Sequence, residues 1–131
     1  MFRRNTYSII FDQNFYGIAH GIMNPLAPSG QGEQNAELSA ALAFASNECQ
    51  LERFTRRDQR LRASVVVPYE DAQASASEIR RRAGDRSFAQ VLLLSRTSEA
   101  LGRNRYWPIY EARSRPAFRS ASMPSAIAAS P

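Results

Sequence analysis

The sequence predicts an α/β fold in which parallel strands alternate with helices. Two segments, Arg62–Tyr69 and Phe88–Arg96, are nearly continuous apolar runs, as expected for strands buried on both faces. Stretches of helix length separate and flank the predicted strands, and connections of that length join parallel strands by right-handed crossovers. Two architectures satisfy this pattern: a doubly wound sheet, or part of a (β/α)8 barrel, which needs about 200–250 residues when complete.

The first predicted strand, Gly17–Leu26, is short and buried and ends at Asn24-Pro25, because proline cannot donate to a strand ladder. Ala27–Gln34 is a loop by its Gly, Pro and Ser content. Asn35 can cap the following helix, whose last turn carries Arg53, Arg56 and Arg57. The predicted buried stripe of this helix has helical spacing and consists of Leu38, Ala41, Leu42, Ala45 and Cys49.

The second predicted helix begins after Asp71, a suitable N-cap, and places Arg80–Arg82 on its solvent face. Thr97–Arg105 is a loop, and Tyr106–Ala112 begins a third helix, in which Pro108 is tolerated only in the first turn. The inner stripe of the second helix consists of Ala72, Ala76, Ile79 and Ala83.

Composition and charge argue against a nucleic-acid or membrane partner. The chain has 131 residues, a net charge of +5 and no lysine among its 17 basic residues. Arg113, Arg115 and Arg119 follow the last acidic residue, and without them 14 basic residues face 12 acidic ones. No apolar stretch approaches the roughly 18–20 residues of a membrane helix. The N-terminus lacks the features of a signal peptide, and the single cysteine, Cys49, is compatible with a cytoplasmic location.

Three residues are candidate substrate-binding groups, because reactive groups of both architectures gather at the carboxyl ends of the strands. Asn24 could hydrogen-bond a ligand or cap the turn before Pro25. Tyr69 could line a pocket or pack on the next helix. Arg96 could pair with a substrate carboxylate, or it could be a solvated or structural arginine.

No catalytic or metal-binding constellation is predicted. Gly30–Gly32 lacks the spacing of a phosphate loop. His20 is the only histidine, and one histidine cannot make a zinc site. Cys49 has no histidine partner in sequence, and Asp71 already has a sufficient role as a helix cap. We therefore expect no catalytic residue, no metal ligand and no cofactor in this chain.

Several stretches nevertheless resemble the amidohydrolase-related proteins, a branch of metal-dependent hydrolases that includes aminocarboxymuconate-semialdehyde-type decarboxylases. The resemblance covers about Tyr16 to Ala112 and rests on GIMNPLAPSGQGEQNAELSAALAFASNE, SVVVPYEDAQASASEIRRRAGDRSFAQVLLLSR and GRNRYWPIYEA. It implies a partial (β/α)8 TIM barrel in residues 1–112, holding strands two, three and four, followed by an irregular, disordered tail in residues 113–131. It also implies a parent enzyme with a zinc-type divalent metal and a small-molecule substrate.

The family's metal ligands have no counterpart at any position of this chain. The family carries a His-x-His pair after strand one and a histidine at the end of strand five, whereas this chain opens MFRRNTYSIIF. The family expects a strand like G-L-P-x-G-I-H after the third helix. GC-rich synonymous codons can be chosen for Arg115–Pro131 that read Ala-Gly-Leu-Pro-Phe-Gly-Ile-His in another frame. We therefore expect a reading-frame shift near Ala112–Arg115.

Two functions follow as predictions. The first is a fragment of a metal-dependent amidohydrolase-type enzyme, inactive as written. Its parent would hydrolyse amide, ester or lactone-like bonds with metal-activated water, or would decarboxylate its substrate. The second is a stand-alone α/β module that binds an acidic ligand through its arginines, namely Arg53, Arg56, Arg57 and Arg80–Arg82.

Overall fold

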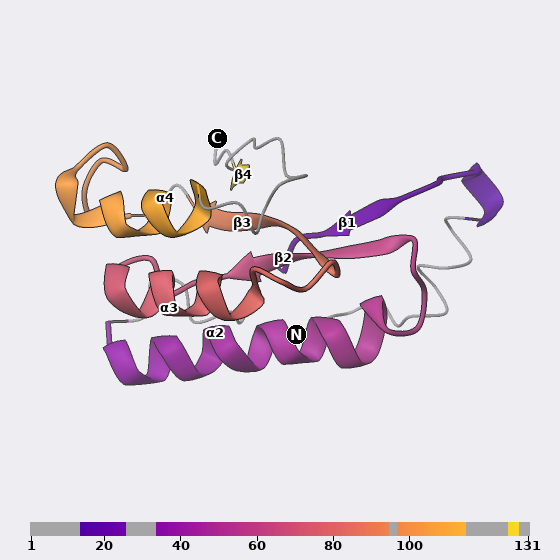
Figure 1. Cartoon of the computed structure of the whole chain (residues 1–131), viewed down its shortest axis with the longest axis horizontal. Coiled ribbons are helices and arrows are strands. Elements are labelled where there is room, and N and C mark those ends of the chain that lie inside the picture. The colour runs from indigo at the N-terminus through magenta and orange to yellow at the C-terminus, as the bar shows by residue number, and fades with distance from the viewer. Residues whose placement is uncertain (1–13, 26–33, 95–96, 115–125, 129–131) are drawn as a thin grey trace.

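A computed structural model describes residues 14–25, 34–94, 97–114 and 126–128 of the chain and shows a parallel sheet with helices between its strands (Figure 1). The four strands are all parallel and lie in the order β1-β2-β3-β4. A doubly wound sheet reverses its strand order at a switch point, and this sheet does not. The strands are β1 (Gly21–Met23), β2 (Leu61–Val66), β3 (Phe88–Leu94) and β4 (Ala126–Ala128).

Helices follow the first three strands, as the sequence predicts. The N-cap side chains Asn35 and Asp71 accept hydrogen bonds from Leu38 N and Ala74 N, each at 3.0 Å, which confirms both predicted caps. Pro108 lies in the first turn of its helix, the position where it was expected. The elements are α2 (Ala36–Gln50), the π-helix η1 (Leu51–Thr55), α3 (Ala72–Arg82), the 3₁₀ helix η2 (Asn104–Tyr106) and α4 (Trp107–Ser114).

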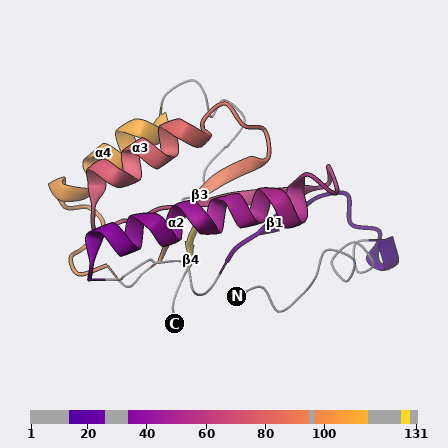
Figure 2. The same ribbon diagram turned by 90° about the horizontal axis from the view of Figure 1, so that it is seen from below.

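The hydrophobic core lies between the sheet and helices α3 and α4, which Figure 2 shows together on one side of the strands. From β2 it takes Ala63 and Val65, which alternate with residues that face the other way. A bulge in β3 interrupts the register, because Ala63 pairs with Phe88 whereas Ser64 pairs with Gln90. The remaining core residues are Leu51, Val67, Tyr69, Ala76, Ile79, Phe88, Val91, Leu93, Tyr106, Ile109 and Ala112.

The first predicted strand is shorter and more exposed than expected. Only Gly21–Met23 is a strand, and Ile22 at its centre is 52% exposed. Residues 14–16 form a helical turn that ends at Gly17, whose φ of 65° is in the left-handed region that favours glycine. His20, expected inside the strand, precedes it and is exposed. The strand lies at the edge of the described sheet, where β2 is its one neighbour among the described strands.

The predicted buried stripe of α2 is wrong, because the helix faces the sheet with polar residues. Leu38 is 46% exposed, and Ala41 and Ala45 are exposed as well. The buried residues are instead Ser39, Ala43, Asn47 and Gln50. Hydrophobic periodicity cannot detect such a face, since its polar groups are buried only because the strand β2 offers them hydrogen-bond partners.

The predicted solvent face of α3 is wrong at Arg82, which is 5% exposed. Its Nε donates to Glu78 at 2.8 Å and its Nη1 to Glu48 at 2.5 Å. Its guanidinium also lies over the rings of Phe44 and Phe88, with distances of 5.2 Å and 5.6 Å to the ring centroids. Two carboxylates and two aromatic rings thus compensate the burial of this charge.

The predicted boundary at residue 112 falls inside α4, which continues to Ser114. Within the predicted tail, Ala126–Ala128 forms β4 and pairs in parallel with Leu92–Leu94 of β3. The other tail residues lie outside the described part of the chain, as do the Gly30–Gly32 loop and Arg96. None of the described helices is long and apolar enough to cross a membrane.

Candidate site at the inner face and carboxyl edge of the sheet

The structure separates the predicted site residues rather than gathering them. Asn24 directly follows β1 and is exposed. Tyr69 follows β2 but is 1% exposed and belongs to the hydrophobic core under α3 and α4. Arg96 lies outside the described residues. Their roles in substrate binding stay predictions, and Asn24 is the described one whose side chain a ligand can reach.

Asn24 belongs to a row of polar side chains that crosses three strands. Ser64 Oγ donates to Asn24 Oδ1 at 2.6 Å, and Gln90 Nε2 donates to the same oxygen at 3.1 Å. Gln90 Nε2 also contacts Ser64 Oγ at 3.0 Å. The row lies on the face of the sheet opposite α3 and α4, because it alternates with the core residues of β2 and β3. We call this face the inner face.

The contacts within the row are made by the oxygen of the Asn24 side-chain amide. Two donors converge on Oδ1, so Oδ1 is the acceptor and Nδ2 carries the hydrogens directed elsewhere. The two N–H groups of this exposed side-chain amide are hydrogen-bond donors. Such an arrangement suits an oxygen acceptor, for example a carboxylate, carbonyl or phenolate oxygen.

A layer of apolar residues follows the polar row toward the carboxyl ends of the strands. Val66 pairs with Leu92 in the register of β2 and β3, and both are 0% exposed. On the other side of the row, Ile22 pairs with Arg62. The paired side chains of the inner face thus form successive layers, two residues apart along each strand. Side chains fill the interior of a closed barrel in layers of this kind.

A second polar cluster lies at the carboxyl edge, where Glu70 holds the loop that follows β3. Its carboxylate accepts from the backbone N–H of Ser98 at 2.8 Å and from Ser98 Oγ at 2.6 Å. Arg105 Nη2 donates to it at 3.1 Å, and the hydroxyl of Tyr106 lies 3.3 Å from it. The side chain of Glu70 therefore holds in place, through hydrogen bonds, a loop that lies about 28 residues later in the sequence.

The cluster also sets the charge state of Glu70. Burial acts to raise the pKa of this carboxyl, but hydrogen bonds from Ser98, the charge of Arg105 and the Tyr106 hydroxyl outweigh it and lower the pKa from its ordinary value. Arg105 is shared, because its Nη1 donates to Glu99 at 2.9 Å. At neutral pH the cluster is therefore a closed set of ion pairs, and its role is to position the loop.

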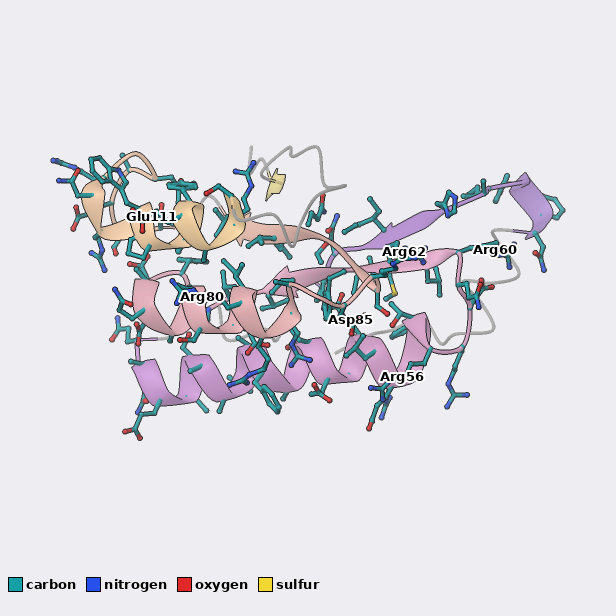
Figure 3. The ribbon with its side chains drawn as sticks, viewed as in Figure 1. Arg56, Arg60, Arg62, Arg80, Asp85 and Glu111 are labelled. Carbon is teal, nitrogen blue, oxygen red and sulfur yellow. The ribbon has the colours of Figure 1, made fainter. Side chains whose placement is uncertain are left out.

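The arginines that could bind an acidic ligand do not form one site. Figure 3 places Arg80 on α3 and Arg56 well apart from it, beyond the end of α2. Arg82 is occupied by Glu48 and Glu78, and Arg57 Nε donates to the backbone of Glu52 at 3.4 Å. Arg53 lies on η1, Arg56 and Arg57 lie in the turn after it, and Arg80–Arg82 lie on α3.

The described residues do not fit a divalent metal. In ranges 14–25, 34–94, 97–114 and 126–128 no group of three or more His, Cys, Asp or Glu side chains could hold one. His20 is exposed ahead of β1, whereas Cys49 is half-buried on α2. Catalytic zinc needs three protein ligands on one centre, so no reaction step can be assigned through a metal to these residues.

Sequence reasoning missed the polar residues inside the strands. Ser64 and Gln90 lie within the predicted apolar runs, yet both are polar side chains at inner-face positions, as is Arg62 of β2. A polar residue within such a run is the available signal, since burial on both faces otherwise selects apolar side chains. Glu70 gave no such signal, because its partners lie far away in sequence.

The comparisons with known proteins agree with this geometry. The family model described as Amidohydrolase matches residues 14–115. The crystal structure of 5-carboxyvanillate decarboxylase from Novosphingobium aromaticivorans, with bound manganese and 3-methoxy-4-hydroxy-5-nitrobenzoic acid, is similar at a TM-score of 0.68 and 25% identity. The match covers 80% of this chain and 30% of that chain. A search of the curated proteins gave no match.

Proposed function

Because the chain belongs to the amidohydrolase family, we propose that it is a fragment of a metal-dependent enzyme of that family. The observation that carries the proposal is the unequal coverage, 80% of this chain against 30% of the decarboxylase chain. The consecutive parallel strands β1-β2-β3 correspond in this proposal to strands two, three and four of the parent barrel. The remaining strands and the metal ligands would belong to the part of the parent that this chain lacks.

The parent reaction is metal-activated hydrolysis or metal-assisted decarboxylation of a small molecule. The similar decarboxylase holds manganese and an aromatic acid, which favours an aromatic acid as the parental substrate class. In the parent, the polar row of Asn24, Ser64 and Gln90 would line one wall of the barrel interior. Its exposed amide donors suit the oxygens of such an acid.

The chain by itself is proposed to be inactive, because a metal-dependent reaction needs a metal centre and the described residues offer no ligand group. The test is to incubate the purified chain with Mn²⁺ or Zn²⁺, desalt it, and measure bound metal together with decarboxylation of 5-carboxyvanillate. We expect substoichiometric metal and no turnover. One tightly bound metal ion per chain, or turnover above a metal-only control, would contradict the proposal.

A reading-frame shift near Ala112–Arg115 is proposed as the origin of the tail, together with a cytoplasmic location for the protein. The DNA sequence of the gene decides the first point. If no single-base insertion or deletion near these codons restores a strand like G-L-P-F-G-I-H, the frame-shift proposal fails, while the fragment proposal stands on the coverage alone.

A further inference from the structure

We propose that the chain binds the surface of an anionic lipid bilayer through a patch that joins an aromatic turn before β1 to an arginine-rich turn before β2. Binding of this kind takes place in the headgroup region and needs no spanning helix. The proposal concerns a partner of the chain itself and does not rest on the proposed parent reaction. We call this surface the projecting patch, and its members are Phe15, Tyr16, Ile18, Ile22, Arg56, Arg57 and Arg62.

The apolar part of the projecting patch is a helical turn that extends past the rest of the fold. Phe15 and Tyr16 are 70% and 71% exposed, the highest values among the large hydrophobic side chains of the described residues. Their rings lie edge to face with centroids 5.0 Å apart, and Ile18 is 42% exposed. Figures 1 and 2 both show this turn at one end of the molecule, beyond the sheet and the helices. Exposed apolar side chains gathered in this way mark an interaction surface.

The charged part of the projecting patch is the turn that connects η1 to β2, which contains four arginines and one acidic residue. Arg60 pairs with the acidic residue, Asp58, at 2.7 Å. The ion pairs among the described residues include none with the other three arginines, Arg56, Arg57 and Arg62. Arg57 and Arg62 donate to backbone carbonyl oxygens, which carry no net charge. The turn therefore presents positive charge that no carboxylate of the described residues compensates.

Direct contacts hold the two parts of the projecting patch together. Arg60 Nη1 donates to Asn14 Oδ1 at 2.8 Å, and the N–H of Gly21 donates to the carbonyl of Arg60 at 2.9 Å. In the sheet register Ile22, which is 52% exposed, pairs with Arg62. Figure 3 shows Arg60 and Arg62 toward the end of the molecule from which the aromatic turn extends. Apolar and positively charged groups thus share one end of the described chain.

An anionic bilayer is the partner whose chemistry suits both parts. Aromatic rings favour the headgroup level of a bilayer, and arginines are attracted to anionic lipids. Residues 14–25 contain no Asp or Glu, so no carboxylate in this segment repels an anionic surface. A single-stranded nucleic acid would also use rings and phosphate contacts. The aliphatic side chains of Ile18 and Ile22 beside the rings favour the bilayer, because they gain by leaving water for the acyl boundary.

The test is co-sedimentation of the full chain with vesicles of phosphatidylcholine, with and without phosphatidylserine. We expect partitioning at least ~10-fold stronger onto the anionic vesicles, weakening as salt is added. The double variant Phe15→Ser/Tyr16→Ser should reduce this partitioning at least ~10-fold, because it removes the apolar surface that enters the bilayer. Trp107→Ser is the matched control, since Trp107 is an aromatic residue that is 53% exposed on α4, and it should leave the partitioning unchanged.

A second pair of variants tests the arginines. Arg56→Gln/Arg57→Gln should reduce partitioning onto the anionic vesicles at least ~10-fold, because it removes two charges close to the bilayer surface. Arg80→Gln/Arg103→Gln removes the same charge from exposed arginines on α3 and ahead of η2. This control should change the partitioning less than ~3-fold, because salt screens charges that lie away from the surface.

The proposal is overturned by a chain that stays in solution, by equal partitioning onto both kinds of vesicle, or by a control as damaging as its matched variant. Binding to single-stranded DNA without binding to vesicles would assign the patch to nucleic acid and would equally overturn it. Circular dichroism shows whether each variant is folded. If Phe15→Ser/Tyr16→Ser does not fold, hydrogen exchange on the unmodified chain replaces it. Anionic vesicles should slow exchange at least ~10-fold more in residues 15–22 than in residues 98–105, and equal slowing would contradict the proposal.

Discussion

The side-chain amide of Asn47 bonds the backbone of Val66 as a neighbouring strand would. Its Oδ1 accepts from the N–H of Val66 at 2.7 Å, and its Nδ2 donates to the carbonyl of the same residue at 2.9 Å. Gln50 repeats the arrangement on Ser64, accepting at 3.3 Å and donating at 2.9 Å. β1 pairs with β2 only as far as Ala63. Beyond that residue, the side-chain amides of α2 bond the backbone of β2 in place of a neighbouring strand.

The first prediction concerns this amide pairing. Asn47→Ala should lower the free energy of unfolding by about 2–4 kcal/mol, because it leaves the buried N–H and C=O of Val66 without partners. Denaturant unfolding measures the loss, and hydrogen exchange at the Val66 amide should accelerate with it. The control, Asn104→Ala, changes an exposed asparagine and should stay within about 0.5 kcal/mol. Equal effects of the two variants would argue against the strand-like role.

The second prediction concerns neighbouring arginines on α3. Arg82→Met should destabilise the fold by about 3 kcal/mol, because it removes the buried partner of Glu78 and leaves that buried carboxylate paired with Arg81, which is largely exposed. Arg81→Met removes a cation whose side chain is 55% exposed and should cost less than about 1 kcal/mol. Thermal or urea unfolding of the two variants measures the loss of stability that each substitution causes. A similar cost for both would mean that the burial of Arg82 does not set its contribution.

The third prediction is a dependence of stability on pH through Glu70. Its pKa is lower in the folded chain than the ordinary value of 4.5, so the folded state favours the carboxylate. The stabilisation is therefore complete above pH 4.5 and is lost as the pH falls through the lower folded pKa. Glu70→Gln should destabilise by about 1–2 kcal/mol at pH 7, and the difference from the unmodified chain should shrink on acidification.

Urea unfolding of both proteins between neutral and acidic pH measures this difference. Glu111→Gln is the control, since Glu111 is exposed on α4 and should show no comparable convergence with the unmodified chain. A Glu70→Gln difference that grows as the pH falls would have the wrong sign for a carboxyl with a lowered pKa.

The fourth prediction separates the expected and observed faces of α2. Leu38→Gln should change the free energy of unfolding by less than about 0.5 kcal/mol, because Leu38 is 46% exposed. Ala43→Gln should cost about 1–3 kcal/mol, because Ala43 is 0% exposed and faces the sheet without space for a longer side chain. Denaturant unfolding of the pair gives the answer, and the reverse ranking would restore the stripe predicted by periodicity.

The sequence alone predicts correctly those elements that depend on interactions between residues close together in the chain. Asn35 and Asp71 cap their helices through donors three residues away, and the apolar runs around Val65 and Val91 form central strands. These features follow from interactions within one turn or one strand. The parallel order of the strands followed as well, because each connection has the length of a crossover.

Only the tertiary structure decided which polar residues are buried and what they hold. Asn47 meets Val66 across 19 residues, Gln90 meets Asn24 across 66, and Ser98 meets Glu70 across 28. A polar side chain is stable inside a protein when a partner compensates its lost hydration, and such a partner is a property of the fold. Hydrophobic patterning therefore predicts that Leu38 is buried and Arg82 is exposed. In the structure Leu38 is exposed, because polar residues of α2 bond the strand β2, and Arg82 is buried, because two carboxylates pair with it.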